Sequence, residues 1–122
     1  MTWNLFLDDE RNLEDVAWAP WQVREKYRNE DWVIARNGME ATYAIAERGC
    51  YPSYISFDHD LGDEDDGETG YDYVKRLVEM DMDTDFPKYK FPVDFDFFVH
   101  SQNHIGKANI EGLLNNYLKH KD

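Results

Sequence analysis

Four short runs of mostly apolar residues occur along the chain, and each leads through a turn into a segment with helical spacing. The runs are WNLFLDDE from Trp3, DWVIARNG from Asp31, SYISFDHD from Ser53 and VDFDFFVHSQN from Val93. Strand-like runs that alternate with helix-length segments are typical of an α/β fold with a parallel sheet. The pattern therefore predicts one domain over residues 1–122, built on a small doubly wound sheet of about four strands in the order 2-1-3-4.

Capping residues place the ends of the predicted helices. We expect a first helix over residues 20–29, which opens on a proline suited to a first turn. A second helix should run between Asn37, a good N-cap, and Gly49, a good terminator. A third should follow Thr69, because Asp72 stands at capping-box spacing from it.

The last run should form an edge strand. The helix after it has a core-facing stripe at i, i+3, i+4, i+7 and i+8, formed by Ile110, Leu113, Leu114, Tyr117 and Leu118. No fifth strand-like run follows this helix. Asp94 and Asp96 suit an edge that must not pair with another chain.

The charge of the chain limits its partners. With 26 acidic and 13 basic residues the formal net charge is −13, which repels the backbone of an extended nucleic acid. An acidic surface of this kind serves solubility, and it also suits a metal site or a basic protein partner. No basic leader with a long apolar segment occurs, so we expect a cytoplasmic protein that does not enter the membrane.

Polar residues follow three of the four apolar runs. They are Asp8 and Asp9, then Asp58, His59 and Asp60, then His100, Ser101, Gln102 and Asn103. Because ligands of an open parallel sheet bind beyond the carboxyl ends of its strands, these side chains should converge. Crowded carboxylates raise one another's pKa unless a cation neutralises them, and oxygen ligands suit Mg²⁺, Mn²⁺ or Ca²⁺. The simpler interpretation is that each aspartate only caps a turn or ends a strand.

Titratable and basic groups near these strand ends add candidate roles. His59 and His100 are placed to exchange protons near neutral pH or to bind a metal, although a lone histidine is as often a packing residue. Asn103 should cap the last helix, with Lys107 one turn inside it, which makes an anion-binding helix end. Arg11 can supply a second positive charge. Together with Lys107 and the helix end beside a metal, it predicts a phosphate ligand.

The acidic loop after the third run is not an EF-hand. Aligning the EF-hand glycine with Gly67 or Gly62 puts Gly62 or Phe57 at the first ligand position, where an aspartate is needed. We interpret residues 63–66 as a solvated loop outside the site.

Several motifs occur in one order over nearly the whole chain: LFLDDER, ISFDHDLG, TGYD, VHSQN and IGKANI. In this combination the chain resembles the cyclic-phosphate-processing receiver-like domains. The resemblance implies a shortened receiver (flavodoxin-like) fold in which Asp8 and Asp9 match the acidic metal pair and Asp58 matches the phosphoacceptor. A standard receiver has a fifth strand ending in a lysine that contacts the acyl phosphate, and this chain shows no such strand.

The family pattern suggests that four residues form a hydrolytic or phosphate-binding site in its place: His59, Asp60, His100 and Ser101. The leading hypothesis is a phosphoesterase that uses Mg²⁺ or Mn²⁺, held by the three strand-end aspartates and Asp60. Its substrate would be an RNA 2',3'-cyclic phosphate end or a small cyclic nucleotide. His59 or His100 would move protons, the phosphate would be held by Arg11, Asn103 and Lys107, and Asp58 could instead attack directly.

Two alternatives remain. One is a non-catalytic module that binds a phosphorylated ligand, or docks a protein partner through its acidic surface. The other is an acidic inhibitor that mimics nucleic acid, which only the net charge supports.

Overall fold

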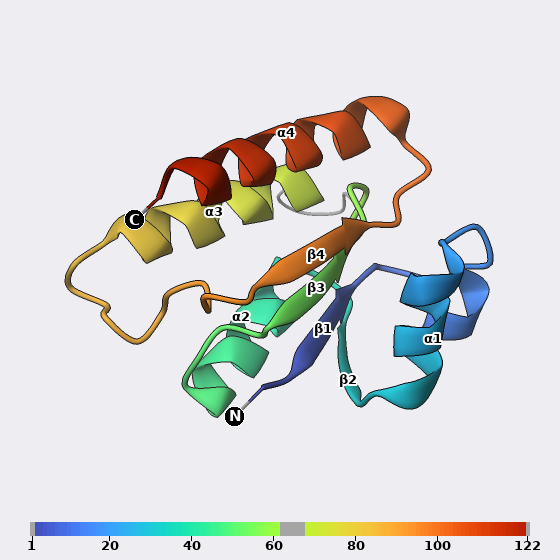
Figure 1. The fold of residues 1–122 in the computed structure, drawn as a ribbon, viewed down its shortest axis with the longest axis horizontal. Helices are drawn as coiled ribbons and strands as arrows, with labels where there is room; N and C mark the ends of the chain where they lie inside the picture. Colours follow the sequence, from blue (N-terminus) through green and yellow to red (C-terminus); the bar gives the residue numbers. More distant parts are fainter. Residues whose placement is uncertain (1, 62–67, 122) are drawn as a thin grey trace.

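Four parallel strands in the order β2-β1-β3-β4 form the centre of the protein, as the sequence pattern predicted (Figure 1). The computed structural model describes residues 2–61 and 68–121. The elements are β1 (Asn4–Leu7), η1 (Leu13–Asp15), α1 (Trp21–Asn29), β2 (Trp32–Ala35), α2 (Gly38–Arg48), β3 (Tyr54–Phe57), α3 (Gly70–Met82), β4 (Asp96–Val99) and α4 (His104–His120). The acidic loop interpreted as solvated, residues 63–66, lies outside the described residues.

Helices cover both faces of the sheet because alternate strand residues point to opposite sides. Leu5 and Leu7 of β1 belong to the larger core, which α2, α3 and α4 close. Phe6 points the other way, into a smaller cluster with Tyr27 of α1 and Val16. Figure 1 shows α3 and α4 side by side over one face, with α1 on the other side of β1 and β2.

The predicted helix caps are present. The Asn37 side chain accepts the N–H of Glu40 at 2.8 Å, and Gly49 ends α2 with a left-handed φ of 75°. Thr69 and Asp72 exchange two hydrogen bonds of 3.1 Å at the start of α3. One boundary differs by a residue, since α1 begins after the proline at position 20, which is its N-cap.

Two glycines let helix ends approach the carboxyl end of β3. A Cβ at Gly70 would lie 2.0 Å from the carbonyl oxygen of Asp58. A Cβ at Gly106 would lie 2.2 Å from Cγ of the His59 ring. Real Cβ atoms do not approach this closely, so these two glycines allow the first turns of α3 and α4 to lie against the residues that follow β3.

Strand β4 is the edge strand that the sequence predicted, and side chains occupy part of its outer side. The N–H of Asp96 donates to Ser53 beside β3, so the backbone groups of the next residue, Phe97, point outward. The Asp96 carboxylate accepts the Phe97 N–H at 2.9 Å. Lys107 Nζ donates to the carbonyl of Val99 at 3.0 Å. Both contacts cap groups that another strand would need.

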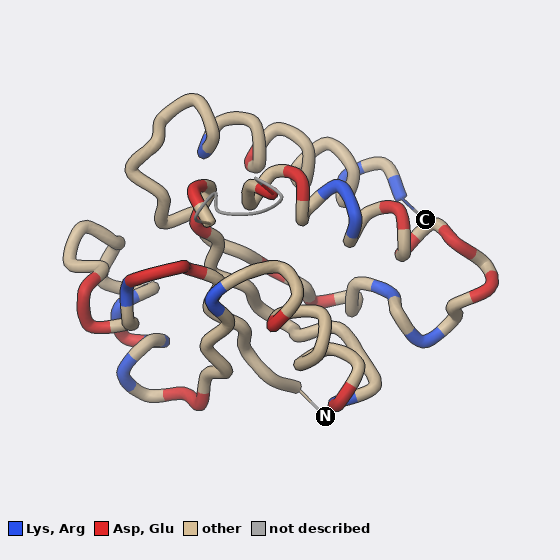
Figure 2. Tube along the Cα trace, turned by 180° about the vertical axis from the view of Figure 1, so that it is seen from behind, with Lys and Arg blue, Asp and Glu red and all other residues tan. Residues whose placement is uncertain are grey.

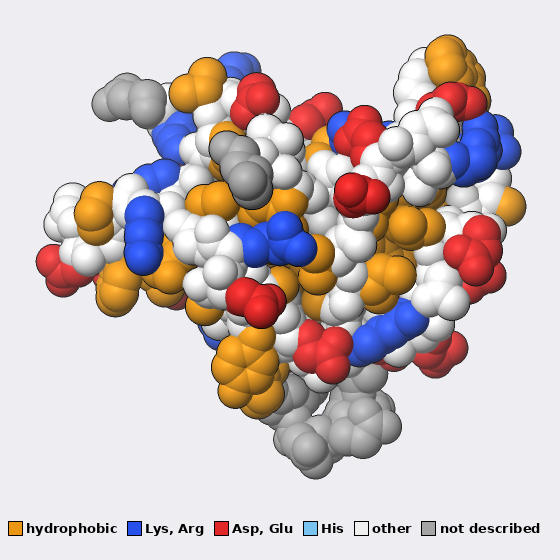
Figure 3. All heavy atoms as spheres, turned by 90° about the horizontal axis from the view of Figure 1, so that it is seen from below, with side chains coloured by type: hydrophobic (Ala, Val, Ile, Leu, Met, Phe, Trp, Pro, Cys, Tyr) orange, Lys and Arg blue, Asp and Glu red, His pale blue; other side chains and the backbone are white. Residues whose placement is uncertain are grey.

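Charge is spread over the molecule. Figure 2 shows acidic segments on several elements and loops, and the face in Figure 3 mixes acidic, basic and hydrophobic side chains. Within residues 2–61 and 68–121, no helix has the length and apolar character needed to cross a membrane.

Candidate functional site

The carboxyl ends of β1, β3 and β4 bring three predicted site residues together. Asp8, Asp58 and His100 each offer a ligand atom within 4.8 Å of the others, and all three are buried. Asp8 and His100 have no exposed surface, and Asp58 is 3% exposed. Two carboxylates and an imidazole in a buried position form a group that can hold a metal ion.

Several hydrogen-bond donors surround the Asp8 carboxylate. Its Oδ1 accepts the backbone N–H groups of Glu10 at 2.8 Å and Arg11 at 2.7 Å, and its Oδ2 lies 2.9 Å from Nε2 of His100. Burial alone would raise the pKa of Asp8, but these donors lower it to about 2. Asp8 is therefore a fixed, ionised carboxylate in the absence of any metal.

Asp58 has the opposite environment. Its Oδ1 accepts the N–H of His59 at 2.8 Å, and both this N–H and the Ser101 side chain act to lower its pKa. Burial, and next the charge of Asp8, raise the pKa of Asp58. Its negative charge is thus unfavourable unless a cation lies beside it.

Arg11 supplies such a charge from the loop after β1. Its Nη1 lies 3.5 Å from Oδ2 of Asp8 and 3.9 Å from Oδ2 of Asp58. Its Nη2 donates to Gln102 at 3.4 Å, and the guanidinium lies 5.0 Å from the centre of the Trp18 ring. The predicted basic residue of the site therefore contacts both carboxylates directly.

His59 belongs to a second group beside the first. Its Nδ1 lies 3.2 Å from Oδ1 of Asp60 and 3.4 Å from Nδ2 of Asn103, and its ring lies against Gly106. Asn103 caps α4, as predicted, by accepting the N–H of Gly106 at 2.9 Å. Among the described residues, no hydrogen bond engages Nε2 of His59, which leaves that atom available for a proton.

Three other predicted residues lie outside the buried group. Asp9 is half-buried, and burial together with the charge of Asp8 raises its pKa. Asp60 is exposed. Lys107 is engaged elsewhere, since its Nζ pairs with Glu111 at 3.3 Å besides its bond to β4. Of the four aspartates proposed for the metal, the structure brings only Asp8 and Asp58 together within the described residues.

Sequence reasoning missed three residues that contact the site. Trp18 donates its indole N–H to the carbonyl of His100 at 2.9 Å. Ser56 lies 2.7 Å from Nδ1 of His100, and Tyr27 lies 2.6 Å from Ser56. Ser56 had a local signal, since a serine interrupts the apolar run YISF. Trp18 and Tyr27 had none, because their contacts join residues far apart in the sequence.

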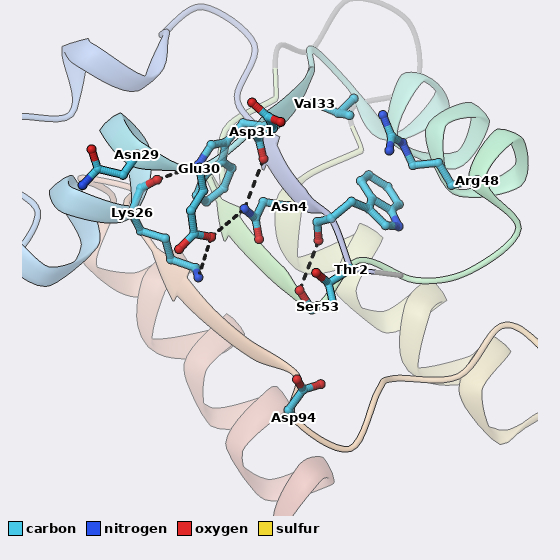
Figure 4. Close-up of a pocket in the computed structure, with 12 residues that line it drawn as sticks. Thr2, Asn4, Lys26, Asn29, Glu30, Asp31, Val33, Arg48, Ser53 and Asp94 are labelled. Atoms are coloured by element: carbon cyan, nitrogen blue, oxygen red, sulfur yellow. Dashed lines mark hydrogen bonds and ion pairs between the residues drawn. The ribbon is translucent and has the colours of Figure 1, made fainter.

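A pocket of about 660 Å³ lies away from this site, near the amino ends of the strands (Figure 4). There Asn4 donates to the Glu30 carboxylate at 3.0 Å and to the Asp31 carbonyl at 3.1 Å. None of the described residues that line it was a predicted site residue. The chemistry that the sequence predicted therefore belongs to the opposite edge of the sheet.

Comparisons with known proteins identify the family. The family model for the cyclic-phosphate processing receiver domain matches residues 3–116, nearly the whole chain and all the strand ends described above. A search of curated proteins and a search of solved structures each gave no match. The family match covers β1 to β4 and most of α4, so this chain belongs to the cyclic-phosphate processing receiver domain family.

Proposed function

We propose that this protein is a metal-dependent phosphoesterase that opens a cyclic phosphate, either at an RNA 2',3'-cyclic end or in a cyclic nucleotide. The observation that carries the proposal is the buried group of Asp8, Asp58 and His100 with Arg11 across it. The family match supports the cyclic phosphate as the substrate class.

The residues present fit a divalent cation. Two buried carboxylates offer the oxygen ligands that Mg²⁺ and Mn²⁺ prefer, and burial raises the pKa of Asp58, whose charge a bound cation would stabilise. In the proposal Asp8 and Asp58 hold the ion, and Asp9 approaches it when the ion binds. When bound, the cation would polarise the phosphoryl group and lower the pKa of a coordinated water.

The other residues would bind the phosphate and move protons. Arg11, one-third exposed, would turn from the carboxylates to the phosphate oxygens. Backbone N–H groups at the start of α4, after Asn103, would donate to a second phosphate oxygen. His59 is the proton-transfer residue of the proposal, with Asp60 orienting its ring. Ser101 would hold Asp58 in place.

The test is turnover of a panel of cyclic phosphates. Wild-type protein is incubated with 2',3'-cyclic and 3',5'-cyclic nucleotides and with an RNA that ends in a 2',3'-cyclic phosphate, in Mg²⁺, Mn²⁺ or EDTA. We expect cleavage only with metal and a loss of about 10²-fold or more for Asp58→Asn and for His59→Ala. The matched control is Asp94→Asn, an exposed aspartate before β4 and away from the site, which should keep wild-type turnover. Metal-independent cleavage, or full activity of Asp58→Asn, would contradict the proposal.

One observation favours the alternative of a non-catalytic module that binds a phosphorylated ligand. Arg11 already lies within 4 Å of both carboxylates, so the site has a cation of its own. For a binding module, Arg11→Gln should abolish binding of a cyclic nucleotide measured by calorimetry, with no turnover by the wild type under any metal. Turnover by the wild type excludes this alternative.

A further inference from the structure

A buried chain of four polar side chains runs from α1 across one face of the sheet to the site. The Tyr27 hydroxyl lies 2.6 Å from Oγ of Ser56, and this Oγ lies 2.7 Å from Nδ1 of His100. Nε2 of His100 then lies 2.9 Å from Oδ2 of Asp8. Tyr27 is 6% exposed and the other three have no exposed surface, so water does not compete for these bonds.

The Asp8 carboxylate, at one end of this row of side chains, sets the direction of the hydrogen bonds. Oδ1 of the Asp8 carboxylate accepts two backbone N–H groups and its Oδ2 faces Nε2 of His100, so Nε2 carries a proton and donates it to Oδ2. In a neutral imidazole Nδ1 is then an acceptor, which requires the Ser56 hydroxyl to donate to it. The oxygen of Ser56 is left to accept the Tyr27 hydroxyl.

The reverse direction leaves a buried donor without a partner. If Nδ1 of His100 carried a proton, Ser56 would accept it and turn its own hydrogen toward Tyr27. The Tyr27 hydroxyl makes no other hydrogen bond within the described part of the chain, so its proton would point at no acceptor. Burial raises the pKa of Tyr27 to about 12, so the phenol keeps that proton at neutral pH. Buried donors without acceptors are unfavourable, which selects the first direction.

Packing holds the imidazole in the same orientation. The Phe6 ring is stacked on the His100 ring with centroids 4.6 Å apart and an angle of 4° between the planes. Trp18 donates to the backbone carbonyl of His100 at 2.9 Å. The ring is therefore fixed on its face, at both nitrogens and through its own backbone.

We propose that Tyr27 and Ser56 are positioning residues that hold His100 in the tautomer with its proton on Nε2, and that His100 thereby fixes Asp8. His100 then neither transfers a proton to the substrate nor binds the metal itself. This inference deepens the proposed function, on which it rests for the role of Asp8 as a cation ligand. It assigns proton transfer to His59 alone. Outer hydrogen-bond partners of a metal ligand commonly change metal affinity by about 10-fold to 100-fold.

The first test is nuclear magnetic resonance of the ring nitrogens in protein labelled with ¹⁵N-histidine, with His100 assigned by the His100→Gln variant. We expect a protonated Nε2 and an unprotonated Nδ1, unchanged when Mg²⁺ is added. Ser56→Ala should shift the Nδ1 resonance, because it removes the hydrogen bond to that atom. A proton on Nδ1, or loss of the Nε2 proton on addition of Mg²⁺, would overturn the assignment.

The second test measures Mg²⁺ affinity from the rise in melting temperature with metal concentration. We expect Ser56→Ala to weaken the apparent affinity about 10-fold and Tyr27→Phe by a smaller factor in the same direction, with Ser56→Thr closer to wild type because it keeps the hydroxyl. Tyr73→Phe is the matched control, since it removes a buried tyrosine hydroxyl that lies 3.1 Å from Thr42 of α2, away from the site. It should lower the melting temperature and leave the affinity unchanged.

The outcomes separate the positioning role from a merely structural one. If the Ser56 and Tyr27 variants lose stability yet keep wild-type Mg²⁺ affinity, as expected of Tyr73→Phe, the positioning role is refuted. If the Ser56 variants do not fold, Tyr27→Phe decides, because it removes a single oxygen atom. Should wild-type protein show no response to Mg²⁺ or Mn²⁺, the proposed metal function fails, and the nitrogen resonances alone then decide the tautomer.

Discussion

Neutralising Asp8 and neutralising Asp58 should have opposite effects on the stability of the metal-free protein. The pKa of Asp8 lies well below its ordinary value, so its ionised form is more stable in the folded state than in the unfolded state. Burial and the charge of Asp8 raise the pKa of Asp58, so its ionised form is less stable in the folded state. At pH 7, Asp8→Asn should destabilise the fold and Asp58→Asn should stabilise it.

The size of the Asp8 effect follows from its pKa. The difference between the ordinary value of 3.8 and about 2, at roughly 1.4 kcal/mol for each pKa unit, corresponds to about 2 kcal/mol of unfolding free energy. Asparagine cannot replace the carboxylate, because its amide nitrogen would face either two backbone N–H groups or the Nε2–H of His100. For a domain of this size we expect the melting temperature to fall by about 10 °C.

The assay is chemical and thermal unfolding at pH 7 in EDTA and again in excess Mg²⁺. In EDTA we expect the order Asp58→Asn, wild type, Asp8→Asn from most to least stable, with the exposed-site control Asp94→Asn within about 0.5 kcal/mol of wild type. In Mg²⁺ the advantage of Asp58→Asn should disappear, because only the wild type gains binding energy. If Asp58→Asn destabilises the metal-free protein as much as Asp8→Asn does, the reasoning from their environments is wrong.

Three further outcomes are expected. Because a lowered pKa contributes stability that is lost as pH falls through it, the melting temperature should drop between about pH 4 and pH 2, and less steeply in Asp8→Asn. Gly106→Ala should cost about 1–3 kcal/mol in denaturant unfolding, since its Cβ would meet the His59 ring, and His59→Ala in the same chain should recover part of the loss. The double variant Asp96→Ala, Lys107→Met should self-associate in size-exclusion chromatography because it uncaps the outer side of β4, and an unchanged monomer fraction would contradict that role.

The architecture was predictable because its signals are local. Apolar runs, cap residues and helix-ending glycines form patterns that span only a few residues. The caps at Asn37, Thr69 and Asn103 all form as expected. The convergence of Asp8 and Asp58 followed from topology, because the carboxyl ends of neighbouring parallel strands meet at one edge.

The composition of the buried group was harder to predict because adjacent residues of a strand point to opposite faces. Asp8 continues the alternation of Phe6, which points toward the α1 face, and Asp58 continues that of Ser56. Asp9 and Asp60 follow their neighbours in sequence but lie outside the three-residue group. The sequence alone did not show at which residue each strand ends and the alternation of side chains stops. Asp9 and Asp60 were therefore both included among the predicted metal ligands.

The contacts made by Trp18 and Tyr27 had no counterpart in the sequence pattern. Each side chain reaches the site from the segment that leads through α1, and each meets a residue more than twenty positions away. Hydrophobic periodicity only assigns an aromatic residue to the core or to the surface. Hydrogen bonds that form through tertiary packing leave no local signal in the sequence. Tyr27 both packs in the smaller core cluster and contacts Ser56 through its hydroxyl.

The two buried carboxylates differ in a way that bears on which one meets the ligand. Asp8 has both oxygens engaged by backbone N–H groups and by His100, and its pKa near 2 keeps it a fixed anion. Asp58 has one oxygen held by His59, and its Oδ2 lies 3.9 Å from Nη1 of Arg11. Catalytic sites commonly separate paired carboxylates in this manner, one as an anchor and one as the reacting group. In the proposed function this asymmetry would make Asp58 the carboxylate that responds to the cation and the phosphate, with Asp8 as its fixed partner.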